Sequence, residues 1–332
     1  MAVKENYNYL PWKRDPDNPI FPVVRGTWKH AWTANPDLLL IGDRYFLYYR
    51  GQGTDGKDRI GVMTVHKDKF DGKHFDDYKE NPIIDVGPPG SFDSKYVLDP
   101  AALYIDGKIL LYYTGISGTR QEGEHPDSIG LAISSNGFHF TKYDKNPVFV
   151  GRSPEMIYKD GKFYLIYLKS AHRGYFINGP FYIHLAISED GYHFEEYGTE
   201  PVLPPGNPGQ WDIYHTTPRI LFEDGIYFMI YAGDDTHFDY SKHLGMAASR
   251  DLIHWTKYSG NPIYPRGKNG TWDEGGLWYP TFVRVKDAYY MWYEGYGHGM
   301  RRDESFDVEG YSQIGLATMT GVRLKDLFPE LS

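Results

Sequence analysis

One carboxylate stands at the head of a strand that otherwise has the sequence of a buried core strand. Asp99 precedes Pro100 and is followed by an apolar stretch (101–105), a turn and a Tyr-rich return strand. A carboxylate in such a strand is costly to bury unless it is paired or faces a pocket. We therefore predict that Asp99 performs acid–base chemistry. The alternative is a structural carboxylate that accepts hydrogen bonds from loop amides.

Two further acids and one arginine occupy the position directly after the proline in three related strands. These residues are Asp37, Glu155 and Arg219. Side chains alternate along a strand, so they point the same way as the residue before the proline, one layer deeper. One interpretation is a buried ion network, because unpaired charge at that depth is costly. The other makes Glu155 the second catalytic carboxylate, with Asp37 behind it.

Polar and aromatic side chains flank the same strands and form a predicted binding set. Its members are Asn35, Arg50, Arg152, Lys169, His172, His215, Asp234, Trp278, Tyr279 and Glu294. Three of them, Arg152, Lys169 and His172, come from a single stretch together with Arg173. Such a group of cations favours a ligand that carries an anionic group. The alternative is that these cations balance acids close to them.

These residues are positioned by an internal repeat. The X-Pro pair recurs at intervals of 54 to 64 residues, at Pro36, Pro100, Pro154, Pro218 and Pro280. Each pair opens a short apolar strand, followed by a turn, a Tyr-rich strand, a third strand such as SIGLAIS (128–134) and a fourth strand. Four short antiparallel strands repeated five times predict an all-β, five-bladed β-propeller that forms one domain over residues 1–332.

The N-terminal segment is predicted to close the propeller. Its sequence WKRDPDNPIF (12–21) matches WTKYSGNPIY (255–264) in the fourth repeat, whereas the last repeat lacks a clear fourth strand. Supplying that strand from the N-terminus would remove two exposed sheet edges.

The topology also predicts where the site lies. In a four-stranded meander the first strand lines the axis and the second runs back beside it. The starts of the first strands and the ends of the second strands therefore meet at one face. Polar and ionisable groups gathered at one end of an apolar scaffold indicate a binding site.

The X-Pro strand, the Tyr-rich return strand and turns such as SSNGFHF (134–140) resemble the five-bladed propeller glycosidases of glycoside hydrolase families 43, 32 and 130. The resemblance spans the whole chain. Families 43 and 32 carry acids in the first three blades, and Asp99 in Leu98-Asp99-Pro100 matches the second. Asn35 and Arg152 stand where the other two acids would be. Family 130 carries its acid in a D-P-R motif, which Asp99 also matches, with Ala101 in place of the arginine.

The resemblance implies a glycoside hydrolase that acts exo-wise on short oligosaccharides and inverts the anomeric configuration. Two alternatives stay open. One is a phosphorylase in which Asp99 is the sole acid and inorganic phosphate is the nucleophile. The other is a propeller that binds glycans without cleaving them, because acids of the related families are missing at positions 35 and 152.

Composition excludes several other classes. A formal charge of −9 argues against a nucleic-acid-binding surface, and no cysteine is present for a disulfide or a thiolate metal site. No apolar stretch is long enough to span a membrane, and the N-terminus shows no signal peptide, so we expect a cytoplasmic protein. No cofactor fingerprint is present, and the histidine spacing does not predict a zinc site. The sequence leaves a cation in the axial channel undecided.

Overall fold

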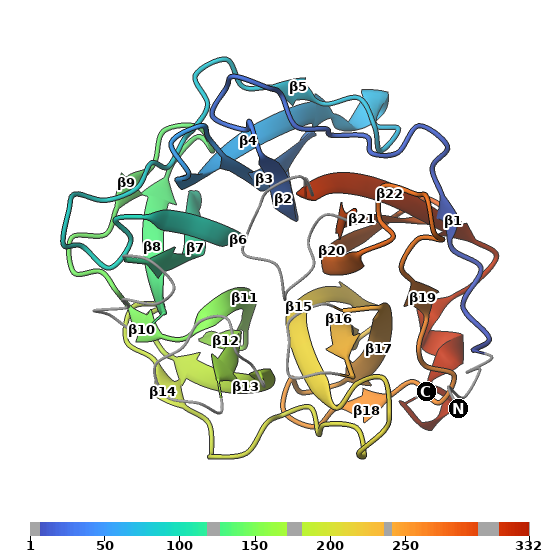
Figure 1. Ribbon diagram of the computed structural model, residues 1–332. Helices are drawn as coiled ribbons and strands as arrows, with labels where there is room; N and C mark the ends of the chain where they lie inside the picture. Colours follow the sequence, from blue (N-terminus) through green and yellow to red (C-terminus); the bar gives the residue numbers. More distant parts are fainter. Residues whose placement is uncertain (1–6, 118–126, 171–180, 236–240, 298–311, 332) are drawn as a thin grey trace.

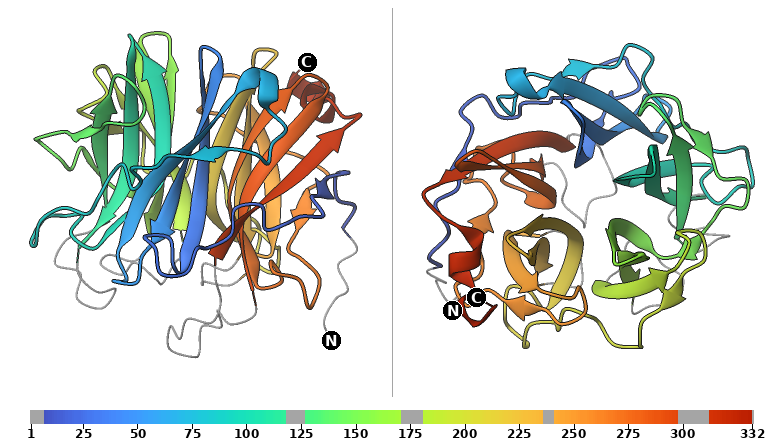
Figure 2. Two further views of the ribbon diagram at one scale, coloured as in Figure 1. Left: turned by 90° about the horizontal axis from the view of Figure 1, so that it is seen from above. Right: turned by 180° about the vertical axis from the view of Figure 1, so that it is seen from behind.

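The computed structural model describes residues 7–117, 127–170, 181–235, 241–297 and 312–331. Five four-stranded blades surround a central axis, and their strands run roughly along it (Figures 1 and 2). The described residues form strands and short 3-10 turns, with no α-helix among them. The predicted all-β five-bladed propeller is confirmed.

Each blade contributes one strand to each of four positions. The first strands, nearest the axis, are β2 (Trp32–Ile41), β6 (Tyr96–Ile105), β11 (Arg152–Lys159), β15 (Tyr214–Glu223) and β20 (Gly276–Val285). The second strands are β3 (Arg44–Gln52), β7 (Lys108–Ile116), β12 (Lys162–Ser170), β16 (Ile226–Asp234) and β21 (Ala288–Tyr296). The third strands are β4 (Asp58–His66), β8 (Ser128–Ser134), β13 (Phe181–Ser188), β17 (His243–Ser249) and β22 (Ser312–Thr320).

The outer strands are short. They are β5 (Asp76–Asp77), β9 (Thr141–Lys142), β14 (Glu195–Glu196), β18 (Thr256–Lys257) and, for the fifth blade, β1 (Lys13–Arg14). Two more short strands, β10 (Phe149–Val150) and β19 (Tyr264–Pro265), pair with β8 and β17. The 3-10 turns are η1 (Lys67–Lys69), η2 (Leu324–Leu327) and η3 (Pro329–Leu331).

The N-terminal segment completes the fifth blade as predicted. Strand β1 pairs with β22 through Lys13 and Arg14. Farther along, Asn18 exchanges two hydrogen bonds of 2.8 Å with the backbone of Leu316. Asn261 makes the same two bonds to Met246 in the fourth blade. The matched sequences therefore perform the same function in neighbouring blades.

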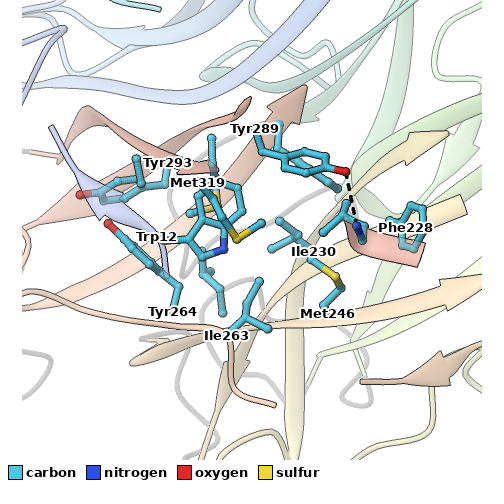
Figure 3. Close-up of a cluster of buried hydrophobic side chains, with 14 of the residues drawn as sticks. Trp12, Phe228, Ile230, Met246, Ile263, Tyr264, Tyr289, Tyr293 and Met319 are labelled. Atoms are coloured by element: carbon cyan, nitrogen blue, oxygen red, sulfur yellow. Dashed lines mark hydrogen bonds between the residues drawn. The ribbon is translucent and has the colours of Figure 1, made fainter. Parts of the chain in front are cut away.

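Side-chain packing fixes the same segment. Trp12 is buried in the cluster between the fourth and fifth blades, among Ile263, Tyr264, Tyr293 and Met319 (Figure 3). The segment thus contributes a large apolar side chain to the core as well as a strand edge.

Trp12→Ala is expected to lower the free energy of unfolding by about 3 kcal/mol, because truncation leaves a cavity among these side chains. Lys13→Ala, at an exposed position of the same segment, should change it by about 0.5 kcal/mol or less. Denaturant unfolding of the two variants checks this, and deletion of residues 1–22 should destabilise the protein more than either. A deletion variant that melts at the parent temperature would contradict closure by this segment.

Every blade also contains a tyrosine, a carboxylate and a lysine or arginine in contact with one another. In the second, fourth and fifth blades the carboxylate follows an aromatic residue in the loop before the first strand, and the base lies on the outer strand. These sets are Tyr113–Asp93–Lys142, Tyr231–Asp212–Lys257 and Tyr293–Asp273–Arg14. In the first and third blades the carboxylate lies on the outer strand instead, in the sets Tyr49–Asp77–Lys29 and Tyr167–Glu196–Lys169. In both arrangements one carboxylate is paired with one lysine or arginine, so each set is neutral. This charge balance indicates a structural role for the five sets.

Candidate active site

The residues before the five prolines form a ring around the axis. Each first strand has an irregular register at its X-Pro pair, as in a β-bulge, and each residue before the proline has a positive φ. The ring members are Asn35 (φ 47°), Asp99 (φ 56°), Ser153 (φ 49°), Thr217 (φ 51°) and Tyr279 (φ 45°). Such a backbone is costly for threonine and tyrosine, and strain of this kind gathers at functional sites. All five side chains are buried.

Hydrogen bonds link the ring members across the blades. Asp99 Oδ2 accepts from Ser153 Oγ at 3.1 Å, and Ser153 Oγ lies 2.6 Å from the Tyr279 hydroxyl. The Asp99 amide donates to Asn35 Oδ1 at 3.4 Å, and the Tyr279 amide donates to Thr217 Oγ1 at 3.2 Å. Asp99 is 0% exposed, and among the described residues its Oδ1 has no hydrogen-bond partner. A buried carboxylate oxygen without a hydrogen-bond partner in the protein is expected to gain one from a bound ligand.

Glu294, at the end of β21, adds a second carboxyl group to the ring. Its Oε2 accepts from the side chain of Asn35 at 2.7 Å and from the Asn35 amide at 3.2 Å, and Ser312 donates to its Oε1. Asn35 therefore joins Glu294 to Asp99. Complete burial raises the pKa of Glu294 to about 7, against a lowering by the nearby positive charge of Arg50, while the charge of Asp99 raises it further. Glu294 is thus partly protonated at neutral pH.

Glu294→Gln is expected to remove a pH-dependent loss of stability. A folded-state pKa raised by burial favours the protonated form, so the contribution of Glu294 to stability is lost as pH rises from about 4.5 through about 7. Relative to the parent, the variant should gain about 3 kcal/mol between pH 5 and pH 8. Denaturant unfolding at both pH values checks this. An unchanged difference between the two proteins would show that Glu294 does not titrate in this range.

The predicted second layer is an ion network centred on Arg219. The guanidinium contacts Glu155 Oε2 at 3.3 Å and Asp37 Oδ1 at 4.0 Å. The same guanidinium donates to backbone carbonyls of three first strands, those of Pro100, Pro154 and Pro218. The carboxylates likewise accept amides of neighbouring blades, Ala102 for Asp37 and Ile220 for Glu155, both at 2.7–2.8 Å.

Two buried carboxyl groups share the one guanidinium. Burial raises the pKa of both Asp37 and Glu155, although Arg219 opposes the shift. Most hydrogen bonds of this network join different blades, and the bond from Arg219 to Pro100 connects the fourth blade to the second. The geometry favours the structural interpretation of Asp37 and Glu155, and their predicted catalytic role stays a prediction.

Arg50 lies beside the ring, paired with an acid. Its guanidinium contacts Asp58 at 2.6 Å and stacks on the ring of Trp32 at 4.0 Å. Arg50 is thus paired with Asp58, and its positive charge also lies close enough to Glu294 to lower the pKa of that carboxyl group.

The cations of the third blade also have acidic neighbours. Lys169 contacts both oxygens of Glu196 at 2.8 Å. Arg152 lies 4.0 Å from Asp127 and packs on the ring of Phe181. Both contacts favour the charge-balance alternative, and an anionic group on the ligand stays a prediction. His172 lies outside the described residues.

Three more predicted binding residues lie near the starts of first strands or at the end of a second strand, and Trp278 is the cross-strand partner of Glu294. His215 is buried 3.8 Å from Asp212 and 3.4 Å from Lys257, and its burial lowers its pKa. Trp278 is half-buried against the ring of Tyr296. Asp234 is the last residue of β16. Binding of substrate by these three residues stays a prediction.

Three residues near the carboxylates were not predicted as site residues. Ser153 shares the position of Asp99 in the repeat, so that spacing alone could have identified it. Asp58 and Ser312 begin third strands, and the third strands start at the face where the second strands end. Extending the topological rule to these starts would have found both.

The described residues contain no cluster of three or more histidine or acidic side chains that could hold a metal ion. None of these residues forms a helix that could cross a membrane.

The sequence matches several curated proteins, although no family model matches it. An uncharacterized protein of Mycobacterium tuberculosis is 25% identical over 82% of this chain and 91% of its own length. The sucrose-6-phosphate hydrolase of Bacillus subtilis is 29% identical over 65% of this chain and 46% of its own length. A 1,2-beta-oligomannan phosphorylase of a Thermoanaerobacter species is 30% identical over 31% of this chain and 36% of its own length.

Solved structures share the fold over nearly the whole chain. An N-acetylgalactosamine deacetylase from F. plautii, in complex with a blood group B trisaccharide, has a TM-score of 0.71 at 17% identity, covering 94% of this chain and 96% of its own. A beta-1,2-mannobiose phosphorylase from Listeria innocua has a TM-score of 0.66 at 13% identity, covering 97% and 99%. The repeat, the fold and the sequence matches together place this chain in the superfamily of five-bladed propeller glycosidases and glycoside phosphorylases, with no single family within it assigned.

Proposed function

We propose that this protein is a glycoside hydrolase that cleaves short oligosaccharides at the axial ring, with Asp99 and Glu294 as its two carboxyl groups. The observation that carries the proposal is the buried Asp99 Oδ1, which has no partner among the described residues. A substrate hydroxyl or glycosidic oxygen would supply that missing hydrogen bond. Asp99 keeps the catalytic role predicted from sequence, and Glu294 replaces Glu155 as the second carboxyl.

The environments of the two carboxyls support different tasks. Glu294, with a pKa raised to about 7, holds a proton that it can donate to a leaving-group oxygen at neutral pH. Asp99 accepts a hydroxyl hydrogen bond on Oδ2 and has no partner on Oδ1 among the described residues, so Oδ1 is the atom that would take a proton from the attacking water. The proton lost by Glu294 is then balanced by the proton that Asp99 takes from water.

Activity on a panel of aryl glycosides and short oligosaccharides, with and without inorganic phosphate, tests the proposal. We expect release of one terminal sugar without phosphate, and release about 10²–10⁴-fold slower by an Asp99→Asn variant. A proton NMR time course should show an inverted anomer first, as the related families imply. A retained anomer would contradict inversion, and a glycan that stabilises the protein yet stays uncut across the panel would favour the glycan-binding alternative.

A second candidate is a phosphorylase, favoured by the match to the 1,2-beta-oligomannan phosphorylase. In that reaction phosphate attacks the anomeric carbon and one carboxyl suffices as acid. Sugar 1-phosphate formed only in the presence of phosphate would decide for it. The same panel of substrates therefore separates the two functions.

A further inference from the structure

One hydroxyl group contacts Asp99 Oδ2, a second hydroxyl contacts the first, and Asp99 Oδ1 has no hydrogen-bond partner among the described residues. Ser153 Oγ lies 3.1 Å from Asp99 Oδ2, and the Tyr279 hydroxyl lies 2.6 Å from Ser153 Oγ. The three residues come from three blades, on β6, β11 and β20. All three side chains are buried. The repeat does not require a hydroxyl side chain at position 153 or at position 279.

The direction of these hydrogen bonds follows from the chemistry of the groups. An ionised carboxylate only accepts, so the single proton of Ser153 Oγ is directed to Asp99. In that arrangement Ser153 Oγ can accept from the Tyr279 hydroxyl, which also acts on Asp99 directly. Backbone bonds hold both residues: the Ser153 amide donates to Thr114 Oγ1 at 2.8 Å, and the Tyr279 amide donates to Thr217 Oγ1. The chain of donors therefore ends on Asp99 Oδ2.

Tyr279 is suited to remain a donor. Burial raises its pKa well above the ordinary value, and the charge of Asp99 raises it further. Its ring packs against Arg219 with 5.4 Å between the guanidinium carbon and the ring centroid. The sequence predicted Tyr279 as a sugar-binding residue, whereas its hydroxyl and its ring both have protein partners here.

We infer that Ser153 and Tyr279 are positioning residues that fix the orientation of the Asp99 carboxyl group through its Oδ2 and leave its Oδ1 to face the substrate. This inference rests on the proposed function. A hydrogen bond to a carboxylate favours its charged form, so loss of either hydroxyl should be visible in the pH dependence of the variant. The two hydroxyls also fix which oxygen is left to react. Neither residue transfers a proton to the substrate.

Other charged or polar groups also surround Asp99 and can change its chemistry independently of the two hydroxyls. Arg152 on β11 acts electrostatically on Tyr279, and Glu294 on β21 interacts with Asp99. On β2, Asn35 contributes an uncharged amide. Tyr279→Phe changes none of these side chains and keeps the aromatic ring, so the loss of one hydroxyl is isolated.

Tyr279→Phe is expected to move the acid limb of the kcat/KM profile to higher pH by about one unit, because the chain of donors to Asp99 is shortened. The same shift should appear in the titration of the Asp99 carboxyl carbon by ¹³C NMR, a readout that needs no turnover. The signal is assigned by its loss in Asp99→Asn. Ser153→Ala removes the direct donor, should shift the titration at least as far, and serves if Tyr279→Phe does not fold.

Tyr113→Phe is the matched control. Its hydroxyl also donates to a buried carboxylate, Asp93 at 2.9 Å, but outside the ring. It should lower stability without moving either the pH profile or the Asp99 signal. An unmoved Asp99 titration in both Tyr279→Phe and Ser153→Ala would overturn the inference and leave the proposed function intact. An Asp99→Asn variant with normal turnover would overturn the proposed function, while the NMR titration would still decide the inference.

Discussion

Asp99→Asn is expected to lower kcat by about 10²–10⁴-fold, because the amide cannot take a proton from water at the ring. The substitution keeps the size of the side chain and can still accept the hydrogen bond from Ser153. Stability should be unchanged or raised, since removing a buried site charge often stabilises a fold. Steady-state kinetics and thermal unfolding of the same preparation measure both effects.

Asp93→Asn provides the control for a buried aspartate without a proposed catalytic role. Asp93 pairs with Lys142 and Tyr113 in the second blade, the blade that also carries Asp99. This variant should lose stability and keep its turnover per folded molecule. If Asp99→Asn behaves in the same way, Asp99 is a structural carboxylate and the catalytic assignment is wrong.

Arg219→Met is expected to lower the free energy of unfolding by about 3–5 kcal/mol, because it leaves Asp37 and Glu155 buried without their counter-charge. The three backbone carbonyls that Arg219 binds lose their donor as well. The loss should be larger at pH 8 than at pH 5, since both carboxyls can be protonated at the lower pH. Denaturant unfolding at the two pH values measures it.

The triple variant Arg219→Met, Asp37→Asn, Glu155→Gln tests why the single variant is unstable. Removing all three charges should restore part of the stability, whereas a loss equal to that of the single variant would point to packing rather than charge. Glu155→Gln alone separates the two roles considered for this residue. Lower stability with normal kcat is expected, and a 10²-fold or larger loss of kcat would return Glu155 to the catalytic pair.

The fold could be predicted from the sequence because each blade repeats the same local signals. The X-Pro pair and the Tyr-rich strand recur at intervals of 54 to 64 residues, and the N-terminal sequence WKRDPDNPIF, which matches WTKYSGNPIY, identified the strand that completes the fifth blade. Asn18 and Asn261 make equivalent bonds, so the match of their sequences reflects a match in structure. Local patterns of this kind are visible without knowing any contact between blades.

The partners of the site residues depend on contacts between blades, which the repeat does not encode. Alternation along the strand placed Glu155 and Asp37 one layer below Asp99, but nothing in it shows that one arginine reaches both carboxylates. Similarly, topology brought Glu294 to the correct face, while its bond to Asn35 joins the fifth blade to the first. Lys169 looked like a ligand-binding cation because its partner, Glu196, lies on a different strand.

A crystal structure of the Asp99→Asn variant with an uncleaved oligosaccharide substrate tests the central claim most directly. We expect the scissile bond at the axial ring, with its glycosidic oxygen in hydrogen-bond reach of Glu294 and the side chain at position 99 beside the anomeric carbon on the opposite side. A sugar bound away from the ring, or a scissile bond flanked by Asp37 and Glu155 instead, would contradict the account.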